Sequence, residues 1–278
     1  MPRVKDLSIS TEDFKTIQKF FLEHTGNSLE EGKEYLVEGR LKSLVYDEKF
    51  EDLQSLVSSL VRDPKGDLGK KVIDALTTHE TSFFRDKHPF ETLKTAIIPE
   101  LLKSDSKEIQ IWSAACSSGQ EPYSLAMLIE ESFMDSRDWE FNIVATEISE
   151  KMLEKCRSGL FSQFEISRGL PPHYLPWFFQ RVESKWQIKP ELRERIDFRY
   201  LNLCTHWGGL QQMDVILMRN VLIYFEDDIK KNIFEKILKV LKPGGHLFLG
   251  SGETPVGFED RLQQTDFSTS ACFKLVSG

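Results

Sequence analysis

From Glu108 onward, short apolar segments alternate with segments of helical periodicity, and this alternation constrains the fold more than any other feature. Strands that alternate with helices predict an α/β fold, a doubly wound, mostly parallel sheet with helices on both faces. The segment Lys242–Gly245, KPGG, is expected to form a glycine C-cap and a turn. The expected strands are Glu108–Cys116, Phe141–Ser149, Ile196–Leu203, Met213–Asn220, His246–Glu253 and Ala271–Gly278, and the expected helices are Glu121–Ser132, Lys151–Leu160 and Asp227–Leu241.

Residues 10 to 75 carry helical periodicity, interrupted by an expected loop at Asp63–Asp67, which predicts a small helical domain in front of the sheet domain. Ser10 with Asp13, and Ser28 with Glu31, have the spacing of a capping box, so a helix is expected to begin after each serine. We therefore expect one domain at residues 1–75 and a second at residues 76–278. Proline and aromatic clusters interrupt the second domain at about residues 158–195, where we expect a small β insertion with a hairpin at Glu183–Trp186.

The composition predicts a cytoplasmic protein. No apolar run approaches the roughly 18 residues of a membrane helix, and the segment MPRVKDLSISTEDF lacks the apolar core of a secretory signal. The four cysteines form neither a CxxC motif nor a Cys/His cluster, so we expect reduced thiols and no metal site. The net charge of −8 argues against a nucleic-acid partner, because binding to phosphates requires cationic side chains. We expect a monomer that does not insert into a membrane.

The segment Trp112–Ser124, WSAACSSGQEPYS, follows the first expected strand. Doubly wound sheets bind ligands at the carboxyl ends of their strands, where small side chains let the backbone approach the ligand. Small residues follow one another here from Ser113 to Gly119. The turn lacks the G-x-G-x-x-G pattern of pyrophosphate sites and the Walker pattern. It favours a nucleoside without a pyrophosphate, such as S-adenosylmethionine, and a tight turn without a ligand is the alternative.

Polar residues at the ends of later strands extend this expected site. Glu147 ends the second strand, where a carboxylate can accept hydrogen bonds from ribose hydroxyls, or can simply be solvated or cap a helix. Asn202 lies where it could meet an adenine edge, and Arg219 with Asn220 lies at a strand tip. The fourth strand lacks the N/D-P-P-Y/F signature of many amino-methylating enzymes, which argues against methylation of DNA adenine.

Together with THETSFFRDKHPF at Thr78–Phe90, these motifs resemble the CheR family, the chemotaxis receptor methyltransferases. The resemblance rests on THETSFFRD, IWSAACSSGQEPYSLA, ATEIS, LNL, RNVLIYF and LKPGG in this order, and it covers nearly the whole chain. It implies an S-adenosylmethionine-dependent protein-glutamate O-methyltransferase that methylates methyl-accepting chemotaxis receptors for sensory adaptation. Taken alone, the phenylalanine pair of the first motif would indicate core packing.

The resemblance also implies which residues form the site. Arg85 and Tyr224 are expected close to the methyl transfer, with Arg85 holding the substrate carboxylate and Tyr224 beside the sulfonium. Two positions depart from the family, since His79 stands where Asn is usual and Glu147 where Asp is common. The expected cofactor contacts are His79, Thr81, Arg85, Ala115, Glu121, Glu147, Asn202, Leu203, Arg219 and Asn220.

Two segments are expected to meet the receptor. The insertion corresponds to the family's small β-subdomain, which in some members docks a peptide from the receptor's C-terminus. The stretch between Phe179 and Ile196 is shorter than in those members, so we expect this chain not to need that tether. In the front domain, Lys33, Arg40 and Lys42 are expected on one helix as a cationic face for the receptor's glutamates. A solvated charged face explains them equally well, because four glutamates share that helix.

Two other functions stay open at the level of the sequence. A methyltransferase acting on a small molecule or RNA would need a lid over a closed pocket rather than a protein-docking domain. A non-catalytic module that binds S-adenosylmethionine or a receptor would have no need for Arg85, Arg219, Asn220 and Tyr224 together.

Overall fold

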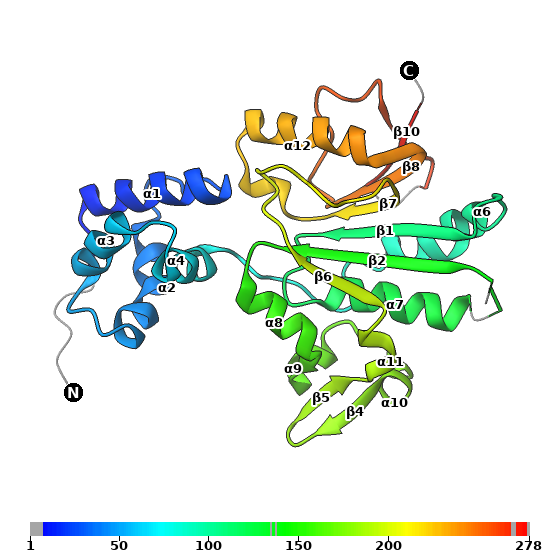
Figure 1. The fold of residues 1–278 in the computed structure, drawn as a ribbon, viewed down its shortest axis with the longest axis horizontal. Helices are drawn as coiled ribbons and strands as arrows, with labels where there is room; N and C mark the ends of the chain where they lie inside the picture. The colour runs from blue at the N-terminus through cyan, green and yellow to red at the C-terminus, as the bar shows by residue number, and fades with distance from the viewer. Residues whose placement is uncertain (1–7, 134, 137, 268–270, 277–278) are drawn as a thin grey trace. The chain divides into compact units, whose positions relative to one another are not determined.

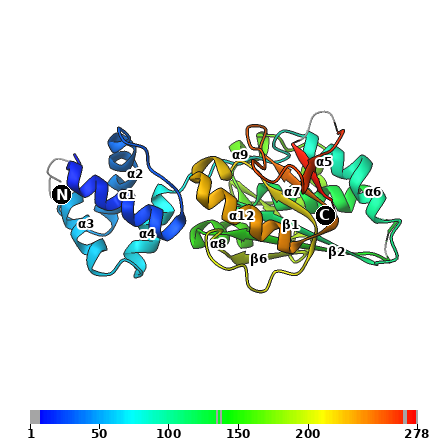
Figure 2. The same cartoon turned by 90° about the horizontal axis from the view of Figure 1, so that it is seen from above.

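The computed structural model describes residues 8–133, 135–136, 138–267 and 271–276, which form two compact units. The first unit comprises Met1–Thr78 and Tyr224–Ile229, and the second comprises His79–Ile223 and Lys230–Gly278. The remaining residues, which include the ends of the expected domains and of the last expected strand, lie outside the described part. Figures 1 and 2 show the elements of each unit in two views.

The first unit is helical, as its periodicity predicts. Its helices are α1 Thr11–Thr25, α2 Glu34–Asp47, α3 Leu53–Arg62 and α4 Asp67–Leu76. Their apolar sides form one core, in which Ile17, Val37 and Leu56 are fully buried. Ser10 caps α1 as expected, because its Oγ accepts a hydrogen bond from the Asp13 N–H at 3.1 Å.

The second expected cap in this unit is wrong. Helix α2 begins at Glu34, well after Ser28, and its N-cap residue Lys33 makes no capping hydrogen bond. The Ser28 N–H instead donates to the carbonyl of Tyr224 at 3.1 Å. A capping spacing is a local pattern, and here a backbone contact across the sequence takes its place.

The second unit is built on a mostly parallel sheet with the strand order β6-β2-β1-β7-β8-β10-β9. Pairs β1/β2, β1/β7, β2/β6 and β7/β8 are parallel, and β10 runs antiparallel to both of its neighbours. Strand β9 was not expected. The strands are β1 Glu108–Ala114, β2 Glu140–Glu147, β6 Ile196–Tyr200, β7 Met213–Met218, β8 Leu241–Leu249, β9 Leu262–Gln264 and β10 Cys272–Leu275.

The expected turn at KPGG is also wrong. Strand β8 begins directly after the helix before it and includes Lys242–Gly245. The segment loops out within the strand, since Met213 pairs with Leu241 whereas Val215 pairs with His246. An irregularity of this kind accommodates extra residues without ending the strand.

Helices accompany the sheet as the alternation predicts. Helices α7 and α8 pack against β2 and β6 (Figure 1), whereas the connection 201–212 between β6 and β7 contains no helix. Parallel strands joined in this way bring their carboxyl ends to one edge, which is where the candidate residues lie. The helices of this unit outside the insertion are α5 His88–Thr92, the π-helical η1 Leu93–Ile97, α6 Ile98–Leu101, α7 Gln120–Ser132, α8 Glu150–Ser158 and α12 Asp227–Val240, whose first residues group with the first unit.

The insertion forms a small antiparallel sheet in the order β3-β5-β4, which confirms the predicted β insertion and its hairpin. It is anchored where Gly169 meets Phe83, because a Cβ at Gly169 would lie 2.0 Å from the Phe83 carbonyl oxygen. Only glycine allows this approach. The elements of the insertion are β3 Leu160–Phe161, α9 Gln163–Ser167, α10 Tyr174–Phe178, β4 Phe179–Val182, β5 Lys185–Ile188 and α11 Pro190–Arg193.

Candidate functional site

The turn after β1 is the centre of the candidate site. Ala115, Ser117 and Gly119 have φ values of 55°, 51° and 94°, so the chain winds through left-handed conformations where small residues are tolerated best. Such strain persists only where surrounding contacts enforce it, and it is concentrated at functional sites. The Ser117 Oγ is buried and has no hydrogen-bond partner in the described part of the chain. A polar ligand at this turn would supply one.

The Cys116 thiol lies under the turn beside Cys156. A hydrogen bond with Cys156 and burial raise the pKa of Cys116 well above its usual value. Both cysteines are buried, so they act as small packing residues rather than as reactive thiols.

Glu147 is brought to the turn, as its position at the end of β2 predicts. Its Oε2 accepts from the Ser117 N–H at 2.9 Å, and its Oε1 accepts from the N–H groups of Ile148 and Ser149 at 2.9 and 3.1 Å. The residue is only 4% exposed. Its carboxylate therefore holds the turn in one conformation. Oε2 can accept a second hydrogen bond, which a ribose hydroxyl can donate.

Arg219 connects three segments at the carboxyl edge of the sheet. Its Nη1 donates to Glu121 Oε2 at 2.8 Å, and its Nη2 donates to Asp86 Oδ2 at 2.6 Å and to the Arg85 carbonyl at 2.9 Å. The Arg219 side chain is 2% exposed. Glu121 in turn accepts from the Ser113 hydroxyl at 2.8 Å. Arg219 thus fastens the FFRD segment to the start of α7, and the sequence did not single out Asp86 or Ser113 for this role.

The FFRD segment combines buried aromatic anchors with a guanidinium that solvent reaches. Phe83 and Phe84 belong to the core, which confirms the packing interpretation of the pair, and the Phe84 N–H donates to Ser124 Oγ at 2.9 Å. Arg85 is half-buried, and its Nη1 donates to the Glu80 carbonyl at 2.9 Å. A guanidinium has five N–H donors, so Arg85 can also hold an anionic ligand.

Asn220 and Glu253 form the second edge of the site. Asn220 follows β7 with φ 58°, and its Oδ1 is buried without a partner among the described residues. Glu253, which the sequence analysis did not select, is 5% exposed and accepts the Asn220 N–H at 2.8 Å. A signal for Glu253 was available, because it is an acidic residue at the end of an expected strand, as Glu147 is.

The remaining expected cofactor residues occupy the same unit. Asn202 and Leu203 follow β6, and the Asn202 Oδ1 accepts the Cys204 N–H at 2.9 Å. The Leu203 carbonyl accepts from Trp207 Nε1 at 3.1 Å and from the Lys236 ammonium. Burial lowers the pKa of Lys236. His79 and Thr81 are half-buried on the segment that leads into FFRD.

Apart from Arg85, the residues expected to meet the substrate or the methyl group belong to the first unit. Tyr224 ends the short helix η2 Leu222–Tyr224, and it groups with that unit. Lys33 forms an ion pair with Glu30 at 3.7 Å, and Arg40 donates to the Leu76 carbonyl and to Thr78 Oγ1. Lys42 is exposed. Arg40 and Lys42 are two residues apart in α2, which separates their side chains by about 160° around its axis.

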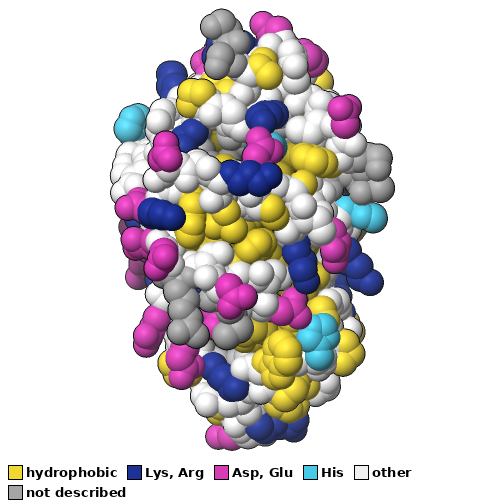
Figure 3. Space-filling model, turned by 90° about the vertical axis from the view of Figure 1, so that its right-hand side faces the viewer, with side chains coloured by type: hydrophobic (Ala, Val, Ile, Leu, Met, Phe, Trp, Pro, Cys, Tyr) yellow, Lys and Arg dark blue, Asp and Glu magenta, His cyan; other side chains and the backbone are white. Residues whose placement is uncertain are grey.

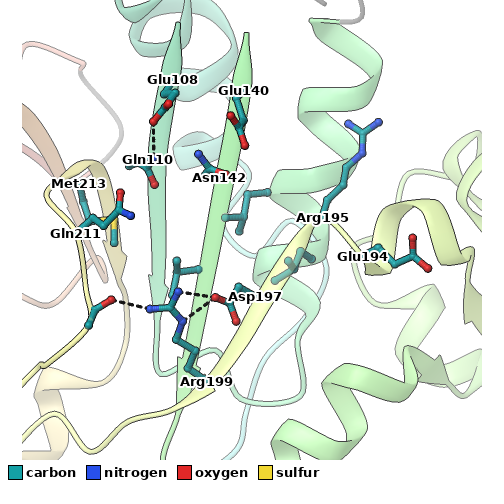
Figure 4. Close-up of a pocket in the computed structure, with 14 residues that line it drawn as sticks. Glu108, Gln110, Glu140, Asn142, Glu194, Arg195, Asp197, Arg199, Gln211 and Met213 are labelled. Carbon is teal, nitrogen blue, oxygen red and sulfur yellow. Dashed lines mark hydrogen bonds and ion pairs between the residues drawn. The ribbon is translucent and has the colours of Figure 1, made fainter. Parts of the chain in front are cut away.

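Two hollows on the second unit contain none of the expected site residues. One, of about 670 Å³, is lined by β1, β2 and β6, and there Arg199 points toward Asp197 and donates to the Gly209 carbonyl (Figure 4). The other, of about 450 Å³, is lined by residues of α7 and β2 and by Phe133 and Trp139 from the connection between them. Hydrophobic side chains are visible on the side of the molecule drawn in Figure 3.

In the described ranges, no group of three or more His, Cys, Asp or Glu residues could hold a metal ion, and no helix is long and apolar enough to span a membrane.

Comparison with known proteins covers both units. Residues 79–271 match the family described as CheR methyltransferase, SAM binding domain, and residues 12–77 match CheR methyltransferase, all-alpha domain. The chain is 39% identical over 273 residues to chemotaxis protein methyltransferase Cher2 of Pseudomonas putida, a match that covers 96% of this chain and 99% of the relative. Chemotaxis protein methyltransferase 1 of Pseudomonas aeruginosa is 38% identical, with the same coverage. Chemotaxis protein methyltransferase 1 of Vibrio cholerae is 35% identical, over 97% of this chain and 98% of the relative.

The residues present fit the cofactor that this family description names. The buried, unpartnered Ser117 Oγ and Asn220 Oδ1 can bond a polar nucleoside, and the small residues of the turn leave room for it. The chain belongs to the CheR methyltransferase family, and it is an S-adenosylmethionine-dependent methyltransferase.

Proposed function

We propose that this chain transfers the methyl group of S-adenosylmethionine to glutamate side chains of methyl-accepting chemotaxis receptors, which leaves glutamate methyl esters. The main support is that relatives named chemotaxis protein methyltransferases match it over nearly their whole length, the all-alpha domain included. The protein acts as a monomer in the cytoplasm, on the cytoplasmic helical region of the receptors.

The chemistry requires little acid or base catalysis from the protein. Bound S-adenosylmethionine supplies a methyl group on a sulfonium. A glutamate side chain has an ordinary pKa of about 4.3, so the acceptor is already ionised at pH 7 and needs no general base. The task of the protein is to align the acceptor oxygen and exclude water, and alignment of this kind contributes on the order of 7–11 kcal/mol.

Arg85 is the residue proposed to align the acceptor. It lies on the segment that Arg219 fastens to α7, and its half-buried guanidinium can hold one carboxylate oxygen by charge-assisted hydrogen bonds. The second oxygen stays available to attack. Tyr224 is proposed to pack beside the sulfonium, because an aromatic face attracts a cation. His79, Thr81, Ala115, Glu121, Glu147, Asn202, Leu203, Arg219 and Asn220 are proposed to contact or order the cofactor.

One experiment tests whether the methyl acceptor is a glutamate side chain of the receptor. The protein is incubated with methyl-labelled cofactor and membranes containing chemotaxis receptors, and the labelled receptor is then treated with mild base. We expect label that is released as methanol, because a glutamate methyl ester is hydrolysed by base. Label that resists base would contradict the proposal, as would incorporation into RNA or small molecules alone.

The receptor-docking proposal for Lys33, Arg40 and Lys42 needs a variant that leaves the fold intact. Lys42 is the suitable site because it is exposed, whereas Arg40 ties α2 to the end of α4. We expect Lys42→Glu to raise the KM for the receptor without changing the affinity for S-adenosylhomocysteine. An unchanged KM would identify these cations as a solvated face.

A further inference from the structure

The Glu253 carboxylate is surrounded by backbone N–H groups. Its Oε2 accepts from Asn220 at 2.8 Å and from Gly250 at 2.6 Å. Its Oε1 accepts from Leu222 at 2.7 Å and from Ile223 at 3.3 Å. Hydrogen bonds to an ionised acceptor are stronger than those between neutral groups, so this one side chain holds both the turn after β7 and the turn after β8.

Sheet topology explains why one carboxylate reaches both turns. Strands β7 and β8 are parallel neighbours, and Met218 pairs with Leu249 at their carboxyl ends. The backbone N–H groups just beyond these ends have left the sheet ladder and need other acceptors. Glu253 lies at the end of a tight turn, in which its own N–H donates to the Gly250 carbonyl at 2.9 Å. This turn places the carboxylate between the two strand ends.

The contact also enforces an unfavourable backbone conformation. Asn220 has φ 58°, in the left-handed region, which costs a non-glycine residue free energy and persists only where surrounding contacts enforce it. Gly250 makes the required room, because a Cβ there would lie 2.7 Å from Asn220 Nδ2 and 2.8 Å from Glu253 Oε2. The Asn220 side chain is thereby fixed with its Oδ1 buried and unpartnered among the described residues.

We propose that Glu253 is a positioning residue of the cofactor site, whose carboxylate holds the Asn220–Ile223 turn in the conformation that presents the Asn220 amide to S-adenosylmethionine. The inference rests on the proposed contact between Asn220 and the cofactor and is independent of the methyl acceptor. Glu253 acts through Asn220.

The test measures binding of S-adenosylhomocysteine by calorimetry, which requires no receptor and therefore separates this inference from the proposed acceptor. In Glu253→Gln one acceptor oxygen becomes an NH₂ group that faces N–H donors. We expect its Kd to rise about tenfold, which corresponds to about 1.4 kcal/mol. Glu253→Asp keeps both oxygens on a shorter side chain and should restore part of the affinity. A purely structural role would lower the melting temperature but leave the Kd of the folded protein unchanged, and that result would overturn the inference.

Further variants and a matched control complete the test. In Gly250→Ala the added methyl group would collide with the Asn220 and Glu253 side chains, so this variant should weaken cofactor binding even if Glu253→Gln does not fold. Wild-type affinity in Gly250→Ala would contradict the inference. In an Asn220→Ala background, Glu253→Gln should add little further loss, and full additivity would show that Glu253 does not act through Asn220. Glu165→Gln is the matched control, because Glu165 also accepts a backbone N–H, from Ser162 at 2.9 Å, but lies in the insertion. It should retain the wild-type Kd.

Discussion

The Arg219 guanidinium donates to the Glu121 carboxylate at 2.8 Å, and the two residues are 98 positions apart in the sequence. This pair is nearly excluded from solvent, with side chains 2% and 12% exposed. Removing one partner of a buried ion pair leaves the other charge without compensation, which is more costly than removing both. The pair therefore provides a direct test of how the site is held together.

We expect Arg219→Met to lower the free energy of unfolding by about 3 kcal/mol and to weaken cofactor binding, because Glu121 then keeps only the Ser113 hydroxyl as a partner in the described part of the chain. The double variant Arg219→Met/Glu121→Gln should lose less stability than the sum of the single variants. Urea unfolding of the four proteins measures the coupling. Additive losses would mean that the contact contributes nothing to stability.

Arg85→Ala should lower kcat by about 100-fold, equivalent to about 2.7 kcal/mol in the barrier, because the receptor carboxylate loses its aligning cation. The melting temperature should change little, since the side chain is half-buried and, among the described residues, donates a hydrogen bond only to the Glu80 carbonyl. Steady-state kinetics with receptor membranes measure this effect. Arg168→Ala is the control, because Arg168 pairs with the Glu80 carboxylate without belonging to the proposed site. Full turnover by Arg85→Ala would rule out its assigned role.

The burial of His246 allows a prediction of how the free energy of unfolding depends on pH. Burial lowers the pKa of His246 from its usual value to about 4, with a further contribution from Lys274. The unfolded chain, with a His pKa of about 6.5, then binds the proton more tightly than the folded protein. The stability contribution is therefore complete above about pH 6.5 and is lost as the pH falls toward 4, by about 2 kcal/mol at pH 5.

The measurement is urea unfolding at pH 7 and pH 5 for the wild type and His246→Leu. The difference in unfolding free energy between the two proteins should shift by about 2 kcal/mol in favour of the variant at pH 5. A difference that is the same at both pH values would show that His246 does not cause the effect. Lys274 and Glu100, which form an ion pair at 3.1 Å near this histidine, remain unchanged in both proteins.

Because the insertion is short, we predict that methylation does not require docking of a peptide from the receptor's C-terminus. Its sheet contains the strands β3, β5 and β4 in that order. Titration of a peptide from the receptor's C-terminus should give no saturable heat, and deletion of that peptide from the receptor should leave the methylation rate unchanged. Tight, saturable binding would contradict this prediction.

Local sequence patterns predicted the parallel strands of the sheet and the tight turn after β1. Alternating apolar and amphipathic segments predict β1, β2, β6 and β7 because burial periodicity is encoded residue by residue. The run of small residues at Ser113–Gly119 predicts a close backbone turn for the same reason. The chain order of the strands then places Glu147 beside that turn. The KPGG segment and Ser28 show the limit of such patterns, since tertiary contacts replaced the expected local structure at both.

Only the tertiary structure decided which residues the side chains of the site bond to. Arg219 was recognised at a strand tip, but its bonds to Glu121 and Asp86 depend on which carboxyl ends meet at one edge of the sheet. Glu253 was placed in an expected strand, although β8 ends at Leu249 and a tight turn carries Glu253 back over Asn220. Periodicity reports which side of an element is buried, but it carries no information about a partner a hundred residues away, which strand order and register determine.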